Sequence, residues 1–565
     1  MTARRAAPNR RIRLLLVVLV LMFTLALGRT VWLQGVRAEP LARLASSQHT
    51  QTVEVPAGRG TILDRTGAEL AIGERATTVY ADPREIRAPR AAAVAAGRAL
   101  GLDPNTLYGL LADRSRHFVH IARKADPAAA ARLRALRIRG FGFLPEERRA
   151  YPQGTIGAHV LGYAGLDNTG LAGLERSLEG VLAGRSGSKT IVTDPYRRTV
   201  SVVRSRPEHN GKNVTLTLDH SLQAQAEAVL RTTVAESRAK SASAVVLDPR
   251  TGEILALAVA PGFDANRFGE TSTERTRNRA VTDTYEPGST FKLMTVAGVL
   301  SAGVATPRTA YTLPYEIQVS DRRIHDSHPR PTERMTVSEI LSRSSNVGTV
   351  RLAQALGKER LVRWIGRFGF GRPTGIDYPG ESPGILPAEP WSGSTIGNVP
   401  IGHGIAVTPV QMAAAYAAVA NGGVWVRPHL VRRIGEAEAV RPARRRVVSP
   451  GVAATLVALL RRVVDDGGTG TAAAVTGYSV AGKTGTAAKP DERGGYSTSR
   501  YVASFVGLVP ASAPRLVILV TVDEPRSAIW GNTVAAPAFA QIASFGLQYL
   551  GVPPDALLRE PATQE

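Results

Sequence analysis

The sequence predicts a protein of the α/β (α+β) class whose C-terminal domain holds a sheet flanked by helices. Three observations lead to this prediction. Residues 243–258 read as an apolar strand, a tight turn and a second apolar strand, and two further strand-like runs follow at 501–510 and 516–522. Helical segments, 221–230 and 530–551, stand before and after these strands. The stretch before residue 207 is instead interrupted by Pro and Gly, which indicates a separate domain.

Length and charge limit the classes of protein that fit. The chain has 565 residues, enough for two or more domains, and a formal charge of +23 from 70 Lys plus Arg against 47 Asp plus Glu. Such a charge suggests nucleic-acid binding, but only 5% of residues are aromatic and no nucleic-acid motif occurs. We therefore favour a basic protein beside anionic phospholipid or cell-wall polymer.

The N-terminus predicts a membrane anchor. Basic residues precede the apolar run 14–27, and a helix from Ile12 to Leu33 would be roughly 33 Å long, enough to cross a bilayer. The basic cluster predicts a cytoplasmic N-terminus, so everything after Leu33 would be extracytoplasmic. The alternative is a cleaved signal peptide, since Ala26-Leu27-Gly28 fits a cleavage site.

A short motif at Ser289 carries the first chemical signal. Pro287 and Gly288 break the preceding structure, Ser289 stands where a helix would begin, and Lys292 follows one turn later on the same face. A buried lysine with a lowered pKa can take the proton of a serine hydroxyl, as histidine does in other hydrolases. Taken alone, S-x-x-K also fits a Ser N-cap followed by a helical Lys.

Two later stretches support a catalytic interpretation of the motif at Ser289. Ser344-Ser345-Asn346 has the form S-x-N, and Lys483-Thr484-Gly485-Thr486 has the form K-T-G. The set S-x-x-K, S-x-N and K-T-G, in that order, is the active-site signature of penicillin-binding proteins and class A β-lactamases.

On these motifs the chain resembles the class B penicillin-binding proteins, which are membrane-anchored, FtsI-like peptidoglycan D,D-transpeptidases. Further matching stretches extend from Arg59 to Pro537. The resemblance implies a transpeptidase domain with an antiparallel sheet and flanking helices, preceded by one transmembrane helix and an elongated α+β pedestal. The expected divisions are a cytoplasmic tail (1–11), the anchor (12–33), a non-catalytic, dimerisation-type pedestal (34–207), the transpeptidase domain (208–552) and a C-terminal tail (553–565).

The resemblance also assigns expected roles to the matched residues. Ser289 would be the nucleophile, Lys292 its base, Ser344 a proton carrier and Asn346 a ligand of the substrate amide. The terminal carboxylate of the substrate would be bound by Lys483, Thr484, Gly485 and Thr486. In the pedestal, Arg59, Asp64, Arg149 and Glu175 would form internal polar ties.

Other polar stretches receive structural interpretations. His325-Asp326-Ser327-His328 is weak as a metal or catalytic site, and Arg343 is expected to be solvated. The Gly402-His403-Gly404 loop lacks the rest of a dinucleotide fingerprint. The sequence contains no cysteine and no His/Cys cluster, so we expect neither a cofactor nor a metal.

Several functions stay open at this point. The main prediction is a transpeptidase of septal wall synthesis, acting on peptidoglycan stem peptides, inhibited by β-lactams and working with a SEDS-family glycosyltransferase and other division proteins in the cell membrane. Glu286 before Pro287 favours the division type. The alternatives are an elongation- or sporulation-specific transpeptidase, a D,D-carboxypeptidase, and a non-catalytic division scaffold or β-lactam sensor. A β-lactamase fits less well, because we see no motif for its deacylating base.

Overall fold

The structure, a computed structural model, describes residues 10–37, 39, 50–193, 199–438, 441–465, 467–491 and 494–556. Most of the predicted cytoplasmic tail (1–11) and C-terminal tail (553–565) therefore lies outside the described residues. The chain divides into two compact units. One comprises Met1–Ala57 and Gly184–Asn210, and the other comprises Gly58–Ala183 and Gly211–Glu565.

The first unit contains the N-terminal helix and a small sheet. Helix α1 (Arg10–Val31) continues as a short π-helical turn to Val36, and its side chains are exposed. It is long and apolar enough to cross a membrane, which agrees with the predicted single-pass anchor. The sheet is antiparallel, in the order β1 (Thr50–Val55), β6 (Gly187–Thr193) and β7 (Thr199–Arg206).

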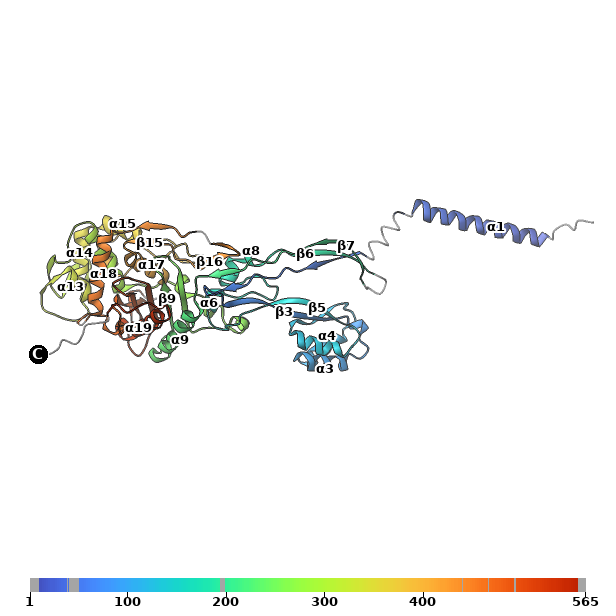
Figure 1. The fold of residues 1–565 in the computed structure, drawn as a ribbon, viewed down its shortest axis with the longest axis horizontal. Helices are drawn as coiled ribbons and strands as arrows, with labels where there is room; N and C mark the ends of the chain where they lie inside the picture. The colour runs from blue at the N-terminus through green and yellow to red at the C-terminus, as the bar shows by residue number, and fades with distance from the viewer. Residues whose placement is uncertain are drawn as a thin grey trace, which may run out of the picture. The chain divides into compact units, whose positions relative to one another are not determined.

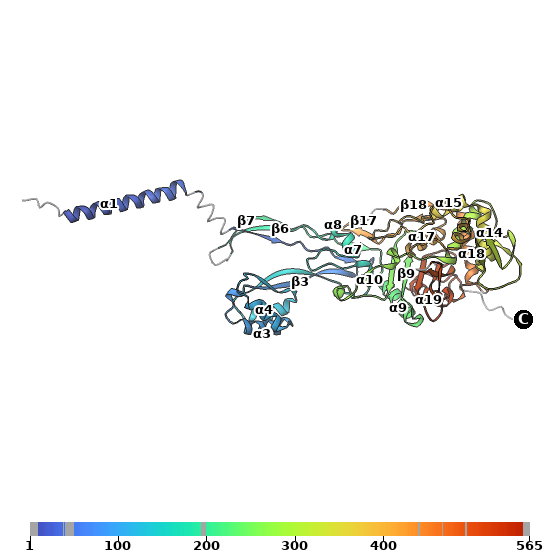
Figure 2. The same ribbon diagram turned by 180° about the vertical axis from the view of Figure 1, so that it is seen from behind.

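In the second unit, the pedestal residues form a lobe with its own small core. The long strand β3 (Glu69–Ala81) pairs with β4 (Val119–Ala125) and with β5 (Phe141–Ala150). Helices α3 (Pro89–Leu100), α4 (Pro104–Ala112) and α5 (Pro127–Ala135) supply mainly Ala and Leu to this core. Both views show α3 and α4 together beside β3 (Figures 1 and 2).

The predicted polar ties of the pedestal are present and buried. Glu175 accepts hydrogen bonds from Arg59 Nε at 2.7 Å and from Arg149 Nε at 2.6 Å, and all three side chains are at most 2% exposed. Asp64 accepts from the backbone of Thr66 and Ala68 and from the imidazole of His220 at 2.6 Å. The interpretation of these residues as structural is confirmed.

A seven-stranded sheet joins the pedestal to the catalytic part of the chain. Its order is β17-β16-β8-β2-β3-β4, with β5 also paired to β3. Strand β8 (Val214–Leu216) was expected to introduce the catalytic domain, yet it runs parallel to β2 (Ile62–Leu63) of the pedestal. Strands β16 (Val431–Ile434) and β17 (Ala437–Glu438) complete the sheet. The boundary at residue 207 stays a prediction.

The catalytic sheet is antiparallel, as predicted, and has five strands. Its order is β10-β9-β21-β20-β19. These strands are β9 (Ser241–Leu247), β10 (Ile254–Ala260), β19 (Ala481–Pro490), β20 (Tyr496–Val509) and β21 (Leu516–Asp523). Strand β19, which carries the K-T-G motif, lies at the edge.

Helices cover both faces of this sheet, which explains why its inner strands are continuous apolar runs. Val245 and Leu247 of β9 belong to one core, and the alternate residues Ala244 and Val246 belong to another. The second core is closed by α9 (His220–Ser237) and α19 (Gly531–Tyr549), which lie side by side in both views (Figures 1 and 2). The first core is closed by α12 (Lys292–Ser301) and α17 (Pro409–Ala420).

The remaining elements complete the second unit. The helices are α6 (Ala158–Leu161), α7 (Gly173–Ser177), α8 (Glu179–Leu182), α10 (Thr273–Thr276), α11 (Arg279–Thr282), α13 (Val337–Ser342), α14 (Asn346–Leu356), α15 (Lys358–Phe368), α16 (Thr395–Asn398) and α18 (Pro450–Val464). Small hairpin-like pairs are β11 (Ala310–Leu313) with β14 (Glu333–Thr336), β12 (Glu316–Val319) with β13 (Arg322–His325), and β15 (Val424–Val426) with β18 (Arg444–Arg446).

Candidate active site

Ser289 lies in a 3-10 turn, Gly288–Phe291, that leads directly into α12. The prediction that it stands at a helix start is correct. The N-cap positions of the turn and of α12 are Pro287 and Phe291, and Ser289 occupies neither of them. The alternative interpretation of Ser289 as an N-cap therefore does not hold.

The turn packs closely against the edge strand β19. Gly288 has a φ of +54°, in the left-handed region that favours glycine. A Cβ on Gly485 would lie 2.9 Å from the carbonyl oxygen of Pro287 and 3.0 Å from Thr290. Gly485 therefore leaves room for the turn that carries Ser289.

The S-x-N motif spans a strained residue and a helix start. Ser344 has a φ of +61°, which is uncommon for a residue with a side chain and clusters at functional sites. Asn346 is the first residue of α14, whose N-cap is Ser345. The helix start fixes Asn346 more firmly than a loop would.

The amines of Lys292 and Lys483 both reach Ser344. Lys292 Nζ donates to the carbonyl oxygen of Ser344 at 2.5 Å, to its Oγ at 3.2 Å and to Oδ1 of Asn346 at 2.6 Å. Lys483 Nζ donates to Ser344 Oγ at 2.9 Å. Within the described residues, no hydrogen bond joins the Ser289 hydroxyl to either lysine. The three motifs nevertheless meet at one point.

Both lysines are fully buried, which changes their acidity. Burial holds the pKa of Lys292 well below its usual value; the charge of Lys483 lowers it further, and Asp326 opposes this shift. Burial lowers the pKa of Lys483 to about 7. The site therefore favours a neutral Lys292 beside a Lys483 that is partly protonated near neutral pH.

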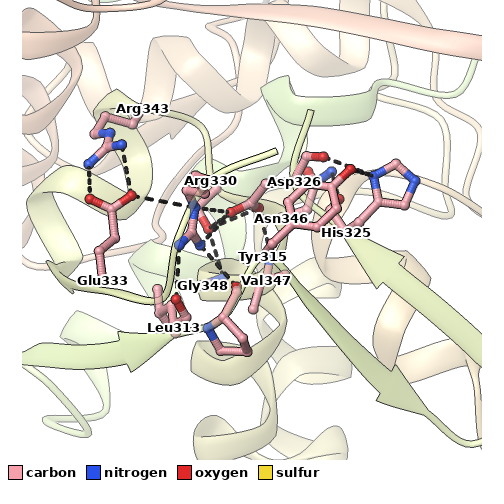
Figure 3. Close-up of polar contacts among 12 residues, drawn as sticks. Leu313, Tyr315, His325, Asp326, Arg330, Glu333, Arg343, Asn346, Val347 and Gly348 are labelled. Atoms are coloured by element: carbon pink, nitrogen blue, oxygen red, sulfur yellow. Dashed lines mark hydrogen bonds and ion pairs between the residues drawn. The ribbon is translucent and has the colours of Figure 1, made fainter. Parts of the chain in front are cut away.

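A network centred on Asp326 positions the S-x-N motif (Figure 3). The Asp326 carboxylate accepts from Ser345 Oγ at 3.0 Å, from the backbone N–H of Val347 at 3.0 Å and from Arg330 at 2.6 Å. The carbonyl oxygen of His325 accepts from Asn346 Nδ2 at 2.9 Å. We missed this role of the His325–His328 stretch, because it is defined only by contacts across the fold.

Arg343 is not simply solvated, as we expected. It forms a bidentate pair with Glu333, with distances of 2.8 Å and 2.9 Å, and Glu333 also lies 3.5 Å from Arg330 (Figure 3). Charged contacts thus connect Arg343 through Glu333 and Arg330 to Asp326. The sequence offered no signal for this connection.

The other K-T-G residues are also placed at the site. Thr484 Oγ1 lies 3.4 Å from both Lys483 Nζ and Thr469 Oγ1, and Thr486 Oγ1 accepts from the backbone N–H of Gly531 at 3.1 Å. The Gly402–Gly404 loop packs on the nucleophile turn, since Gly288 N–H donates to Gly402 at 3.0 Å. This agrees with an architectural role for the loop.

Comparison with known protein families shows to which family the chain belongs. Residues 242–544, more than half of the chain, match the family described as the penicillin-binding protein transpeptidase domain. The chain is a penicillin-binding protein. Residues 54–216 match the penicillin-binding protein dimerisation domain, which is the pedestal of our sequence analysis.

Individual penicillin-binding proteins are similar along nearly their whole length. The chain is 35% identical to the probable peptidoglycan D,D-transpeptidase PenA of Neisseria gonorrhoeae, covering 98% of this chain and 95% of PenA. It is 33% identical to the peptidoglycan D,D-transpeptidase FtsI of Escherichia coli, over 97% and 93% of the two chains. The predicted activity, a serine-type peptidoglycan D,D-transpeptidase, is confirmed at the level of the family.

Solved structures agree with this assignment. Penicillin-binding protein 3 of Mycobacterium tuberculosis, complexed with aztreonam, is 32% identical, with a TM-score of 0.72 over 89% of this chain and 98% of that chain. A peptidoglycan synthetase from Bifidobacterium adolescentis is 28% identical with the same TM-score, over 91% and 98%. The predicted fold class and family are confirmed.

One group of acidic and imidazole side chains in this penicillin-binding protein has metal-like spacing. Ligand atoms of Asp64, Asp219 and His220 lie within 4.8 Å of one another. Their oxygens already serve the fold, because Asp64 binds His220 and two backbone N–H groups while Asp219 caps α9. The donor set therefore fits a structural junction better than a metal site.

Proposed function

We propose that this penicillin-binding protein cross-links peptidoglycan at the division septum through an acyl-enzyme on Ser289. The observation that carries the proposal is the meeting of two buried lysine amines at Ser344, one of them from the helix that Ser289 leads into. Such an arrangement supplies a nucleophile, a neutral base and a cation without any cofactor.

Acylation follows from the protonation states of the two lysines. A neutral Lys292 has two N–H donors, which are satisfied by the Ser344 carbonyl and by Asn346 Oδ1. Its lone pair is then available for the Ser289 proton. The Ser289 oxygen attacks the carbonyl of the penultimate D-Ala, and the backbone N–H groups of Ser289 and Thr486 stabilise the oxyanion.

The tetrahedral intermediate that carries this oxyanion then collapses, and the bond to the terminal D-Ala breaks. The leaving amine needs a proton, and the Ser344 hydroxyl, bridged to both lysines, can deliver it from Lys292. The amine of a neighbouring stem peptide then attacks the acyl-enzyme and forms the cross-link, which regenerates Ser289. Lys483, with Thr484, Gly485 and Thr486, holds the terminal carboxylate before it leaves.

β-Lactams would acylate the same serine. Aztreonam is present in the complex of the M. tuberculosis relative, and its strained amide is a mimic of the peptide bond that Ser289 attacks. We therefore extend β-lactam binding to this chain. The lowered pKa values of the two buried lysines, Lys292 and Lys483, would serve both substrate and inhibitor.

The septal assignment rests on the relatives and on the membrane segment. FtsI-type enzymes are among the similar proteins, and Glu286 precedes Pro287 as in division enzymes. Arginines before and at the start of α1 favour a cytoplasmic N-terminus and an extracytoplasmic catalytic domain. The partner we propose is a SEDS-family glycosyltransferase contacted through the anchor and pedestal.

The decisive experiment is labelling of the full-length protein with a fluorescent penicillin. Ser289→Ala should abolish the label, whereas Ser301→Ala, at the end of the same helix, should keep it. Label retained on Ser289→Ala, or mapped by peptide mass to another serine, would refute the nucleophile. A wild-type protein that never labels would favour a non-catalytic scaffold.

Product analysis then separates the two enzymatic alternatives. A D,D-carboxypeptidase would transfer the acyl group to water and release tetrapeptides, while a transpeptidase gives cross-linked dimers when an acceptor amine is supplied. Depletion in the source bacterium tests the septal role, because blocked division and filaments are expected. Rounded cells would instead assign the enzyme to elongation.

A further inference from the structure

Six arginines from separate segments gather on the catalytic domain, around cavities that none of the proposed catalytic residues lines. Two adjoining cavities, of about 540 Å³ and 280 Å³, are lined by them and share Arg372 and Arg445. We call this surface the arginine groove. It is formed by α15, the segment after it, the segment after β15, and β18, and its arginines are Arg363, Arg367, Arg372, Arg427, Arg445 and Arg446.

The arginines of the groove lack acidic partners. None of the described residues that line the two cavities is Asp or Glu, and none of the six arginines forms an ion pair with a carboxylate elsewhere in the described chain. Their hydrogen bonds go to backbone carbonyls, as from Arg446 to Gly422 at 3.1 Å. The Nε of Arg427 is buried and has no hydrogen-bond partner among the residues that the structure describes. Surface arginines elsewhere, such as Arg148 and Arg343, pair with glutamates.

Aromatic rings hold two of these guanidinium groups in place. Arg445 lies over the ring of Trp425 at 4.4 Å, and Arg367 over that of Trp364 at 4.7 Å. Stacking fixes the plane of a guanidinium and leaves its N–H edge available to a ligand. The groove therefore presents ordered donors rather than freely moving side chains.

The gathered charges repel one another. Burial, and then the charges of Arg372 and Arg367, lower the pKa of Arg445 to about 10, so it remains protonated at neutral pH. The fold thus maintains an uncompensated cluster of positive charge. A bound anion would relieve the repulsion and satisfy the open donors.

We propose that the arginine groove binds a compact anion carrying two linked phosphate groups. Phosphate matches the guanidinium fork and brings more charge per group than a carboxylate, as a cluster of six cations requires. The two adjoining cavities give each phosphate its own set of arginines, and Arg372 and Arg445 lie between them. The ligand is either free diphosphate or the diphosphate ester of a larger, lipid-like molecule.

The test titrates the full-length protein, in a neutral detergent, with inorganic pyrophosphate and measures heat and thermal stability. Wild-type protein should bind and become more heat-stable, and binding should weaken as salt is raised. Arg367→Gln with Arg372→Gln should weaken binding at least tenfold, since both side chains are exposed and line the groove. The matched control is Arg87→Gln with Arg98→Gln, two exposed pedestal arginines, which should bind as wild type.

Further probes define the ligand. Geranyl diphosphate that binds tenfold tighter than pyrophosphate would identify a lipid-like ester, and equal affinities would identify the diphosphate group alone. Citrate that binds as well as pyrophosphate would overturn the assignment to phosphate. The site would be overturned if wild-type protein did not bind pyrophosphate. It would also be overturned if the Arg87→Gln, Arg98→Gln control lost as much affinity as the groove variant.

Folding and site chemistry are checked in the same samples. The groove variant should unfold at the wild-type temperature without ligand and should keep fluorescent penicillin labelling, because the groove contains none of the proposed catalytic residues. Arg445→Lys keeps the charge but removes the fork, so it should weaken pyrophosphate several-fold. The site would also be refuted if both Arg445→Lys and the Arg367→Gln, Arg372→Gln double variant bound pyrophosphate as tightly as wild type.

Discussion

Two buried clusters of charge in this protein are built on opposite principles. In the pedestal, Arg59 and Arg149 hold Glu175 between them at 2.6–2.7 Å. In the active site, Lys292 and Lys483 are equally buried, yet among the described residues neither forms an ion pair with a carboxylate. The first cluster is compensated, and the second is not.

The difference shows how burial can serve either structure or chemistry. A buried cation that is paired keeps its proton, and burial and Glu175 act in opposite directions on Arg59, whose pKa is raised overall. A buried cation without a counter-charge loses its proton more easily, as the lowered pKa values of Lys292 and Lys483 show. The four predictions below test this contrast.

The largest expected effect is on Lys292. Lys292→Arg should reduce acylation by penicillin at least about 1,000-fold, because arginine cannot be deprotonated to act as a base. Stopped-flow or labelling kinetics measure the loss, and circular dichroism checks that the fold persists. Wild-type acylation rates from this variant would exclude Lys292 as the base.

The pedestal cluster should be sensitive to the loss of its anion. Glu175→Gln leaves Arg59 and Arg149 without their shared counter-charge, which costs about 3–5 kcal/mol for a buried pair. The matched control is Glu74→Gln, which breaks an exposed pair with Arg148 and should cost at most about 1 kcal/mol. Denaturant unfolding measures both variants. Equal free energies of unfolding for the two variants would show that burial of the pedestal cluster adds nothing to stability.

Lys483 should bind the terminal carboxylate of the substrate rather than transfer a proton. Lys483→Ala should slow acylation by a D-Ala-D-Ala thioester by roughly 100-fold, since a buried charge partner is lost. An analogue with an esterified carboxylate should be hardly affected. If both substrates lose the same factor, Lys483 acts in proton transfer or in holding the strand.

The smallest effect concerns Glu227, a partly buried carboxyl on α9 that contacts Gly157 of the pedestal. It accepts from Gly157 N–H at 2.9 Å and from Gln223 at 2.7 Å, and burial raises its pKa to about 7. The native state therefore holds a proton that the unfolded chain releases near pH 4.5. Stability should fall as pH rises from about 4.5 to about 7 and should then level off.

Glu227→Gln removes this dependence while keeping an acceptor oxygen for both donors. The variant should be more stable than wild type by on the order of 2 kcal/mol at pH 8.5, and the difference should vanish below pH 4.5. Thermal unfolding across this range checks it. A constant difference at every pH would mean that Glu227 does not titrate as described.

The sequence reveals the parts of the site that are local. Ser289, Ser344 and Lys483 each stand in a short motif that can be recognised from neighbouring residues, and the resemblance to a known family implies that the three motifs meet. The helix start at Ser289 was predicted from its neighbours. Capping of α17 by Thr408, for example, needs only the residues that follow it.

Features that depend on distant segments were not predictable. Asp326 lies 19 residues before Ser345, and only the folded β12–β13 hairpin brings its carboxylate to that hydroxyl. The pKa of Lys483 depends on complete burial, which no motif encodes. The basic residues looked scattered in the sequence, and the arginine groove appears only when four segments come together.

Strand β19 is the last strand of its sheet, and this position has a consequence for substrate choice. An open edge offers backbone donors and acceptors to any extended chain, which is why most proteins shield theirs against aggregation. We expect an incoming peptide to join here as a temporary sixth strand through main-chain bonds. Such pairing would be indifferent to side chains, so the enzyme would tolerate variation along the peptide and be selective only where the peptide ends.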